Sequence, residues 1–376
     1  MTNLRAYLDY NASAPLLPEA ASAVLQVLEN AGNPSSVHRE GIKARRILDH
    51  AREVVAKSVG AQGDSVVFTS GGTEANVLAL VGAPGARRIV SAVEHPSVLK
   101  TAAEVDPHML TAPVDGTGML DLDVLAGYLR QAGPSTLVSI QWVNNETGVI
   151  QSMAEIVAAV HGAGAILHVD AVQALGKLQI SFHESGIDLL TLSAHKVGGP
   201  TGVGALIVRP GLSIAPLLTG GLQERGLRAG TENVAGIAGF AAALISPRFG
   251  VWAQIGAWRD DLERRVRALP GVQVMGTSAP RVVNTSCIAC DGLDGATQVA
   301  ALDLDGVAIS AGAACSSGKV EPSHVLSAMG VAPERARSAI RVSLGWQNTK
   351  NDVDRFVDAY GVLVRRLARR LTVNAA

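Results

Sequence analysis

The stretch LLTLSAHKVGGP, residues 189–200, starts as a short apolar run and ends in a serine, a histidine, a lysine and a glycine pair. An apolar run of this length predicts a buried strand. Lysine is costly to bury, so Lys196 is an unusual residue at the end of such a strand. An amine at the mouth of a sheet suits a Schiff base with a carbonyl cofactor. The alternative is an ordinary surface lysine beside a turn, and spacing alone leaves both open.

Similar apolar runs flank this one, with helical stretches between several of them. The predicted strands are residues 65–69, 88–91, 137–142, 165–169 and 204–208, and residues 153–161 are predicted to be helical. Strands that alternate with helices predict a mostly parallel sheet with helices on both faces. We therefore expect an α/β fold.

Polar or glycine residues follow five of the predicted strands at the point where each strand ends. They are Gly72-Thr73, Glu94-His95, Asn144-Asn145, Asp170 and residues 193–196. In open α/β sheets, ligands bind beyond the carboxyl ends of the strands. The sequence therefore predicts one site at this edge of the sheet.

The character of the sequence changes after about residue 250. A long charged helix is predicted over residues 252–269, and short strands and helices follow it, whereas residues 234–245 read as a buried helix. We expect a large domain over residues 14–250. A smaller α+β domain is expected to combine residues 1–13 with residues 251–376.

Composition limits the classes of protein to which the chain can belong. Of the 376 residues, 48% are hydrophobic and 17% are charged, so a sizeable core is expected and disorder is not. The net charge of -1 gives no electrostatic case for binding nucleic acid or an anionic membrane. No apolar run reaches the ~20 residues that span a bilayer, and the N-terminal residues lack the apolar core of a signal peptide. With only three cysteines, a reducing cytoplasm is the expected location.

Three of the strand-end residues have chemical roles to weigh against structural ones. Thr73 belongs either to an anion site at a helix N-terminus or to a plain helix cap. Asp170 either keeps a pyridine nitrogen protonated or caps a helix. His95 is either a stacking ring and general acid–base or a core histidine.

The three cysteines and one arginine lie in the C-terminal part. Cys315 is surrounded by small residues, as suits an accessible nucleophile. Arg341 lies inside an apolar run and needs an anion, which is either a substrate carboxylate or an internal ion-pair partner. Cys287 and Cys290 have Cys-x-x-Cys spacing, but nothing nearby completes four ligands, so we expect no metal and interpret them as core or edge residues.

Taken together, these segments resemble the cysteine desulfurases of iron–sulfur cluster assembly (NifS/IscS-like), within the class V aminotransferase-like enzymes that use pyridoxal-5′-phosphate (PLP). The segments that carry the resemblance are residues 7–12, 32–36, 69–74, 94–95, 144–148, 168–173, 193–204, 220–231, 309–318 and 339–345. They match in order over nearly the whole chain. The resemblance implies fold type I of the PLP enzymes, with a seven-stranded, mostly parallel sheet in the large domain.

The resemblance also implies roles for individual residues. Lys196 would hold PLP covalently, with Gly72, Thr73, Ser193 and His195 around its phosphate, His95 stacked on its ring, and Asp170 and Gln173 at the ring nitrogen and hydroxyl oxygen. Thr231 would reach the phosphate from the partner subunit of a homodimer. Asn145, Arg341 and Asn33 would bind the substrate, with Asn145 also at the cofactor.

The implied reaction removes sulfur from L-cysteine, which gives L-alanine and a persulfide on Cys315. A protein acceptor such as an iron–sulfur scaffold would then take the sulfur. Alternatives are a selenocysteine lyase, another class V enzyme such as an aminotransferase, and a non-enzymatic sulfur-relay protein. The accessible thiol favours a desulfurase over an aminotransferase, and the presence of Lys196, Asp170 and His95 argues against a vestigial site.

Overall fold

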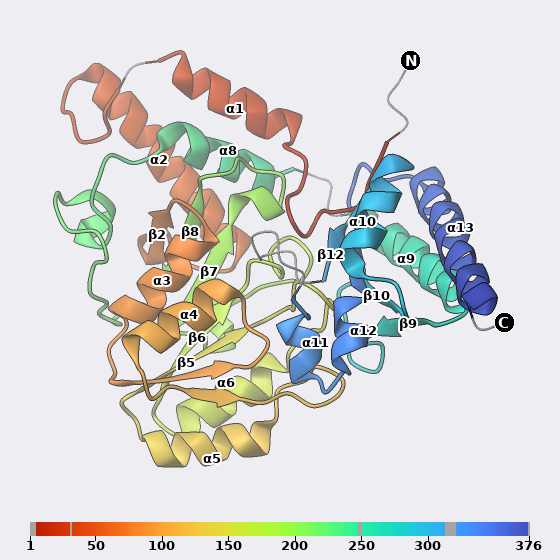
Figure 1. Ribbon diagram of the computed structural model, residues 1–376. Helices are drawn as coiled ribbons and strands as arrows, with labels where there is room; N and C mark the ends of the chain where they lie inside the picture. The colour runs from red at the N-terminus through yellow and green to blue at the C-terminus, as the bar shows by residue number, and fades with distance from the viewer. Residues whose placement is uncertain (1–4, 31, 247–249, 313–320, 375–376) are drawn as a thin grey trace.

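A computed structural model of the chain describes residues 5–30, 32–246, 250–312 and 321–374. Its larger unit is built on a seven-stranded sheet, on the left in Figure 1. The strands are β2 (Val66–Thr69), β3 (Arg87–Ser91), β4 (Leu110–Ala112), β5 (Thr136–Gln141), β6 (Ile166–Asp170), β7 (Leu189–Ser193) and β8 (Gly204–Val208). Their order across the sheet is β2-β8-β7-β6-β5-β3-β4.

All strands of this sheet except β8 run in one direction. Strands β7, β6, β5, β3 and β4 pair in parallel, whereas β8 is antiparallel to both of its neighbours. Because β2 is antiparallel to β8 and β8 is antiparallel to β7, β2 runs the same way as β7. The carboxyl ends of β2, β3, β5, β6 and β7 therefore lie along one edge of the sheet.

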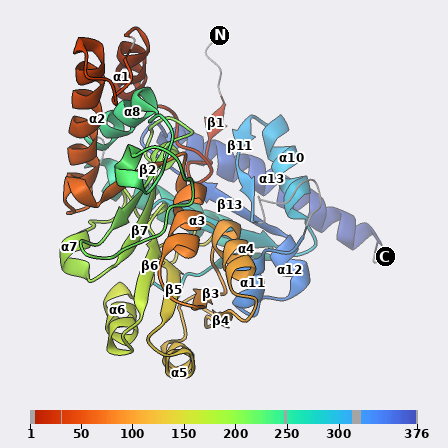
Figure 2. The same ribbon diagram turned by 90° about the vertical axis from the view of Figure 1, so that its left-hand side faces the viewer.

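Helices cover both faces of the sheet, as the prediction of a covered parallel sheet requires. On one face lie α3 (Gly72–Gly82) and α4 (Pro96–Val105), which pack against each other and on β7, β8 and β3. On the other face lie α2 (Arg39–Ser58), α5 (Leu122–Ala132), α6 (Met153–Gly162), the short α7 (Phe182–Ser185) and α8 (Val234–Leu244). Helix α1 (Pro18–Leu28) packs on the outside of α8 (Figure 2).

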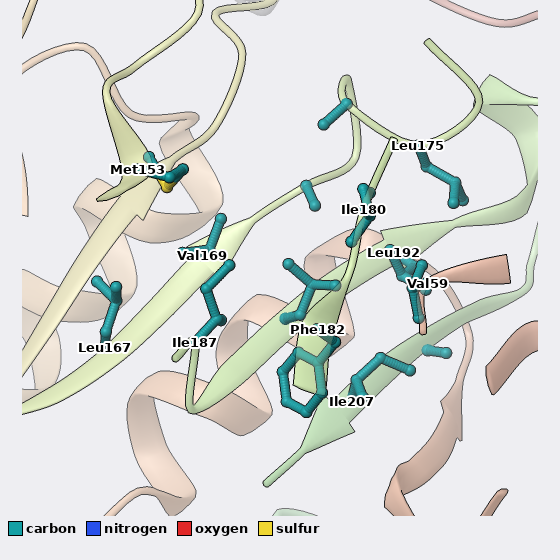
Figure 3. Close-up of a cluster of buried hydrophobic side chains, with 14 of the residues drawn as sticks. Val59, Met153, Leu167, Val169, Leu175, Ile180, Phe182, Ile187, Leu192 and Ile207 are labelled. Atoms are coloured by element: carbon teal, nitrogen blue, oxygen red, sulfur yellow. The ribbon is translucent and has the colours of Figure 1, made fainter. Parts of the chain in front are cut away.

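Side chains of most strands in this sheet alternate between two hydrophobic clusters. On β6, Leu167 and Val169 enter the cluster of Figure 3, together with Leu192 of β7 and Ile207 of β8. Next to them, His168 and Asp170 must point to the opposite face, which α3 and α4 cover, because successive strand side chains alternate. This alternation directs the last residue of β6 toward α3.

The smaller unit lies on the right in Figure 1. A four-stranded antiparallel sheet has the order β12-β13-β10-β9, and β1 pairs in parallel with β11 beside it. The strands are β1 (Ala6–Tyr7), β9 (Val272–Met275), β10 (Thr285–Cys290), β11 (Val307–Ala308), β12 (Ser310–Ala311) and β13 (Ala339–Ser343). The helices are α9 (Trp252–Arg267), α10 (Gly295–Leu304), α11 (His324–Ala328), α12 (Pro333–Arg337) and α13 (Lys350–Asn374).

The expected α/β fold with a seven-stranded, mostly parallel sheet is confirmed. Strand β4 was not predicted, because its three residues, Leu-Thr-Ala, form no recognisable apolar run. The helix predicted over residues 252–269 ends at Arg267. Pairing of β1 with β11 joins the N-terminal arm, residues 5–13, to the small unit. The domain boundaries at residues 13 and 250 stay predictions.

Across the described ranges, the helices are all too short or too polar to cross a bilayer.

Candidate active site

A cavity of about 510 Å³ lies at the edge of the sheet where five strands end. Its volume is in the range of small-molecule binding sites. The small unit closes one side through Gly312 and Arg341. Predicted site residues that line the cavity are Gly72, Thr73, His95, Asn145, Asp170, Gln173, Ser193, His195, Lys196 and Arg341.

Lys196 is the last residue of a 3-10 turn, η2 (Ala194–Lys196), that directly follows β7. Its Nζ donates to the carbonyl oxygens of Asn11 at 2.7 Å and Ala12 at 2.8 Å. Both acceptors belong to the N-terminal arm, so the arm holds the amine at the cavity wall. Lys196 is therefore not an ordinary solvated surface lysine.

Asp170 ends β6, and both of its carboxylate oxygens accept hydrogen bonds. Asn76 of α3 donates to Oδ2 at 2.8 Å, and the backbone N–H of Val172 donates to Oδ1 at 2.9 Å. Asn76 is itself fixed, because its Nδ2 also donates to Ser97 Oγ at 3.0 Å. The contact with Val172 is the local one that a cap would make, whereas the contact with Asn76 fixes the carboxylate at the cavity.

The amino end of α3 faces the cavity through Gly72 and Thr73. Gly71 is the N-cap, so Thr73 lies in the first turn and is not the cap, and no side chain caps the helix. Uncapped N–H groups at a helix N-terminus attract anions. A side chain at position 72 would be crowded, since an added Cβ would lie 2.9 Å from Val172 Cγ2.

His195 also lines the cavity, from the turn that follows β7. Burial, and then the charge of Lys196, lower the pKa of His195 to about 4. The ring is therefore neutral at neutral pH and can serve an anion only as a hydrogen-bond donor.

His95 caps helix α4 with its ring. The backbone N–H of Ser97 donates to His95 Nδ1 at 3.1 Å, so Nδ1 carries no proton and the neutral ring is protonated at Nε2. Burial lowers the pKa of His95, with smaller and opposing influences from Asp170, which raises it, and from Lys196 and His324, which lower it.

Arg341 lies in the middle of β13 and is only 3% exposed. Its Nη2 forms an ion pair with Asp9 Oδ1 at 2.8 Å, and its Nη1 donates to the carbonyl oxygen of Asn145 at 3.2 Å. The structure thus contains the internal ion pair that the sequence left open. It also places the guanidinium at the cavity, so the two interpretations are compatible.

The remaining predicted site residues are Asn33, Thr231 and Cys315. Asn33 and Thr231 are exposed and do not line the cavity. Cys315 lies outside the described residues, and its described flanking residues Gly312 and Glu321 both line the cavity. The predicted roles of all three stay predictions.

Several residues at the site were not singled out from the sequence. Asn11 is 2% exposed, and its Nδ2 donates to Thr285 Oγ1 at 2.9 Å and to the carbonyl oxygen of Asn145 at 3.1 Å. Asn76 follows Gly72 by four residues, the spacing of one helix face, which is a signal that could have revealed it.

Glu146 is a third residue that was not singled out from the sequence, and it also lines the cavity. Its Oε2 accepts a hydrogen bond from Ser323 at 2.5 Å. Burial raises the pKa of Glu146 to about 7 against the lowering influence of Ser323 and Arg341. A carboxyl group at the cavity wall is therefore partly protonated near neutral pH.

Cys287 and Cys290 are both buried in β10. They pack into different clusters on opposite sides of the small sheet. Burial raises the pKa of Cys287, which makes a reactive thiolate unfavourable there.

Comparison with known proteins identifies the family. A family model described as Aminotransferase class-V matches residues 6–356. The chain is 43% identical to a cysteine desulfurase from Cereibacter sphaeroides, and the match covers 96% of each chain. The chain belongs to the cysteine desulfurase family within aminotransferase class V.

Solved structures of similar proteins share the fold. A NifS-like protein from Rickettsia africae ESF-5 is 33% identical, with a TM-score of 0.86 that covers 95% of this chain and 98% of that one. SspA, solved in complex with cysteine, is 29% identical, with a TM-score of 0.79 over 91% of this chain and 99% of that one. These likenesses confirm fold type I of the PLP enzymes.

Membership of class V implies PLP, and the cavity of this cysteine desulfurase family member fits that cofactor. The uncapped amino end of α3 suits a phosphate, and Gly72 leaves the backbone there without a side chain. Asp170 presents a fixed carboxylate that suits a protonated pyridine nitrogen. Lys196 presents an amine that suits an aldehyde.

Proposed function

We propose that the chain removes sulfur from L-cysteine with PLP as its cofactor and produces L-alanine and a persulfide on Cys315. The observation that carries the proposal is that Lys196, Asp170 and the amino end of α3 line one cavity. These three groups match three separate parts of the same cofactor, which a surface lysine or an isolated helix end would not do.

Lys196 is proposed as the covalent anchor and as the base. PLP, when bound, withdraws electrons from the α-carbon of an amino acid. Once the substrate has displaced it, the Lys196 amine would take the α-proton on Nζ. The carbonyl oxygens of Asn11 and Ala12 support this role because they give the released amine two acceptors within 2.8 Å.

Asp170 is proposed to keep the pyridine nitrogen protonated. Hydrogen bonds from Asn76 and from the N–H of Val172 prevent the carboxylate from rotating. A charge held in place costs little reorganisation when electron density moves toward it.

His95 is proposed to lie against the cofactor ring and to move protons to the departing fragment. Its neutral ring carries the proton on Nε2, because Nδ1 accepts from Ser97. Because the pKa of His95 is lowered, the ring gives up a proton more readily after it has taken a second one.

The substrate carboxylate is proposed to bind Arg341 and Asn145. Arg341 Nη1 is held by the carbonyl oxygen of Asn145, and Asp9 holds Nη2. A guanidinium fixed in this way can offer a carboxylate a directed set of N–H donors. Asn33 is proposed as a further substrate contact.

Cys315 is proposed as the sulfur acceptor. Its thiolate would attack the substrate sulfur, so that a new S–S bond forms as the carbon–sulfur bond breaks. The carbon fragment takes up protons and leaves as alanine, and the sulfur stays on the enzyme as a persulfide. Gly312 and Glu321, which line the cavity, support a position of the thiol near the substrate.

A homodimer is proposed, with Thr231 and Gln173 serving one cofactor site from two subunits. Exposed apolar side chains support a partner surface. Leu222, in the same segment as Thr231, is 88% exposed, and Leu25 and Leu28 of α1 are also exposed. Such side chains favour burial against another subunit.

An iron–sulfur scaffold is proposed as the protein that receives the sulfur, in the cytoplasm. The family resemblance supports the iron–sulfur scaffold as acceptor. The small number of cysteines supports a location in the cytoplasm. Neither nucleic acid nor a membrane is a proposed partner.

Incubation of the PLP-loaded protein with L-cysteine and a reductant tests the proposal. We expect equal amounts of alanine and sulfide. Cys315→Ala should keep the bound cofactor but release no sulfide. Equal turnover by parent and Cys315→Ala would contradict the persulfide route. Transamination without sulfide would indicate an aminotransferase, and activity on selenocysteine alone would indicate a selenocysteine lyase.

A further inference from the structure

A second buried amine lies behind the cofactor cavity, at Lys177. It follows Gln173 by four residues in the turn after β6. Its Nζ donates to Gln173 Oε1 at 2.7 Å and to Asn11 Oδ1 at 3.0 Å. The amine thus touches a cavity residue and the N-terminal arm, although nothing in the site described above uses it.

These contacts fix the orientation of the Gln173 amide. Oε1 is occupied by Lys177, and Nε2 donates to the carbonyl oxygen of Asn11 at 2.9 Å. An amide has two N–H hydrogens, so one remains for an acceptor in the cavity that Gln173 lines. If the amide turned over, its oxygen would face that acceptor and repel it.

The environment of Lys177 favours a donor without a full charge. Its side chain is partly exposed as a whole, but the amine at its tip is enclosed. Burial, and then the positive charges of Lys196 and Arg341, hold the pKa of Lys177 well below its usual value. A neutral amine has two hydrogens, which match the two amide oxygens that accept from it.

We propose that Lys177 is a positioning residue of the cofactor site: it locks the Gln173 amide with Nε2 toward the cavity, ready to donate to the ring hydroxyl oxygen of PLP. The inference rests on the proposed function, since it assumes that this cofactor occupies the cavity. It assigns Lys177 an effect that acts through Gln173 and not through direct contact.

A double-mutant cycle on cofactor binding tests this coupling. Cofactor-free parent, Lys177→Met, Gln173→Ala and the double variant are titrated with PLP, and the dissociation constant and the absorbance band of the bound cofactor are recorded. We expect Lys177→Met to weaken binding about two- to tenfold, the effect of one hydrogen bond. The band should shift in the same direction as in Gln173→Ala, and the double variant should match Gln173→Ala alone.

Two further variants separate positioning from general damage. Lys57→Met removes an exposed lysine of α2 and should bind PLP like the parent. Lys177→Gln keeps an uncharged NH2 donor, as the environment of Lys177 favours, and should bind PLP more tightly than Lys177→Met. Thermal unfolding of the cofactor-free variants shows whether each one folds. If Lys177→Met does not fold, Lys177→Leu, which also removes the amine, takes its place in the cycle.

Two results would overturn the inference. One is parent-like affinity and absorbance in Lys177→Met. The other is additive losses in the double variant, which would mean that Lys177 acts independently of Gln173. A parent protein that binds no PLP would be a different failure, since it would remove the proposed function itself and this inference with it.

Discussion

Asn76 of α3 donates to Asp170 Oδ2 at 2.8 Å, and this bond joins the helix whose amino end faces the cavity to the strand that carries the carboxylate. We predict that Asn76→Leu, which keeps the volume but removes the donor, weakens PLP binding about tenfold or more, because hydrogen bonds to charged groups are strong. Titration of the cofactor-free variant measures this. Parent-like affinity would show that Asp170 needs no support from α3.

A change at Arg341 should affect the substrate and spare the cofactor. Lysine cannot offer the planar set of donors that a guanidinium offers to a carboxylate. We therefore expect Arg341→Lys to raise KM for L-cysteine about tenfold while the PLP content stays at the parent level. Steady-state kinetics and absorbance give the two quantities. An unchanged KM would assign Arg341 only to its ion pair with Asp9.

Glu146 should make the protein less stable as the pH rises. Burial raises its pKa from 4.5 to about 7, so the folded state holds a proton that the unfolded state has lost between these values. The contribution of Glu146 to the free energy of unfolding is fully present below pH 4.5. It is lost as the pH rises through 7, and the total loss is about 3 kcal/mol.

The variant Glu146→Gln should lack this loss and keep an acceptor for Ser323. Between low pH and pH 7 and above, we expect the free energy of unfolding to fall more for the parent than for Glu146→Gln. Urea unfolding at several pH values measures the effect. Parallel stability curves for the two proteins would refute the assignment.

The ion pair between Arg52 and Glu224 should be important for folding. Arg52 Nη2 lies 2.6 Å from Glu224 Oε1, both side chains are largely buried, and Glu224 also accepts from the N–H of Phe68. Removal of one partner of a buried pair typically costs about 3–5 kcal/mol, and we expect that loss for Arg52→Met. Arg335→Met is the matched control, because its pair with Asp291 is exposed and should contribute less than about 1 kcal/mol. Similar losses for both variants in urea unfolding would contradict this account.

The main sheet could be predicted because its strands are buried on both sides and appear as continuous apolar runs. Strands β7 and β8, for example, begin at the predicted residues. Strand β4 escaped prediction because it is short, and its pairing with β3 depends on tertiary structure. Local sequence carries no information about such a pairing.

The candidate site was predictable where residues follow strands directly, as Asp170 and Lys196 do. The residues that support them come from distant elements and have no local signal. Asp9 and Arg341 are 332 residues apart, so the sequence left the anion partner of Arg341 open. Lys177 was not singled out from the sequence, because its contact with Asn11 depends on where the fold places the N-terminal arm.

Reductive trapping of the bound cofactor tests the central claim most directly. The PLP-loaded protein is treated with borohydride, digested and examined by mass spectrometry to find the lysine that carries the pyridoxyl group. We predict that this lysine is Lys196. A label on another lysine would contradict the account, whether on Lys177 or on Lys100, which lines the cavity as Lys196 does. The absence of any label would contradict it as well.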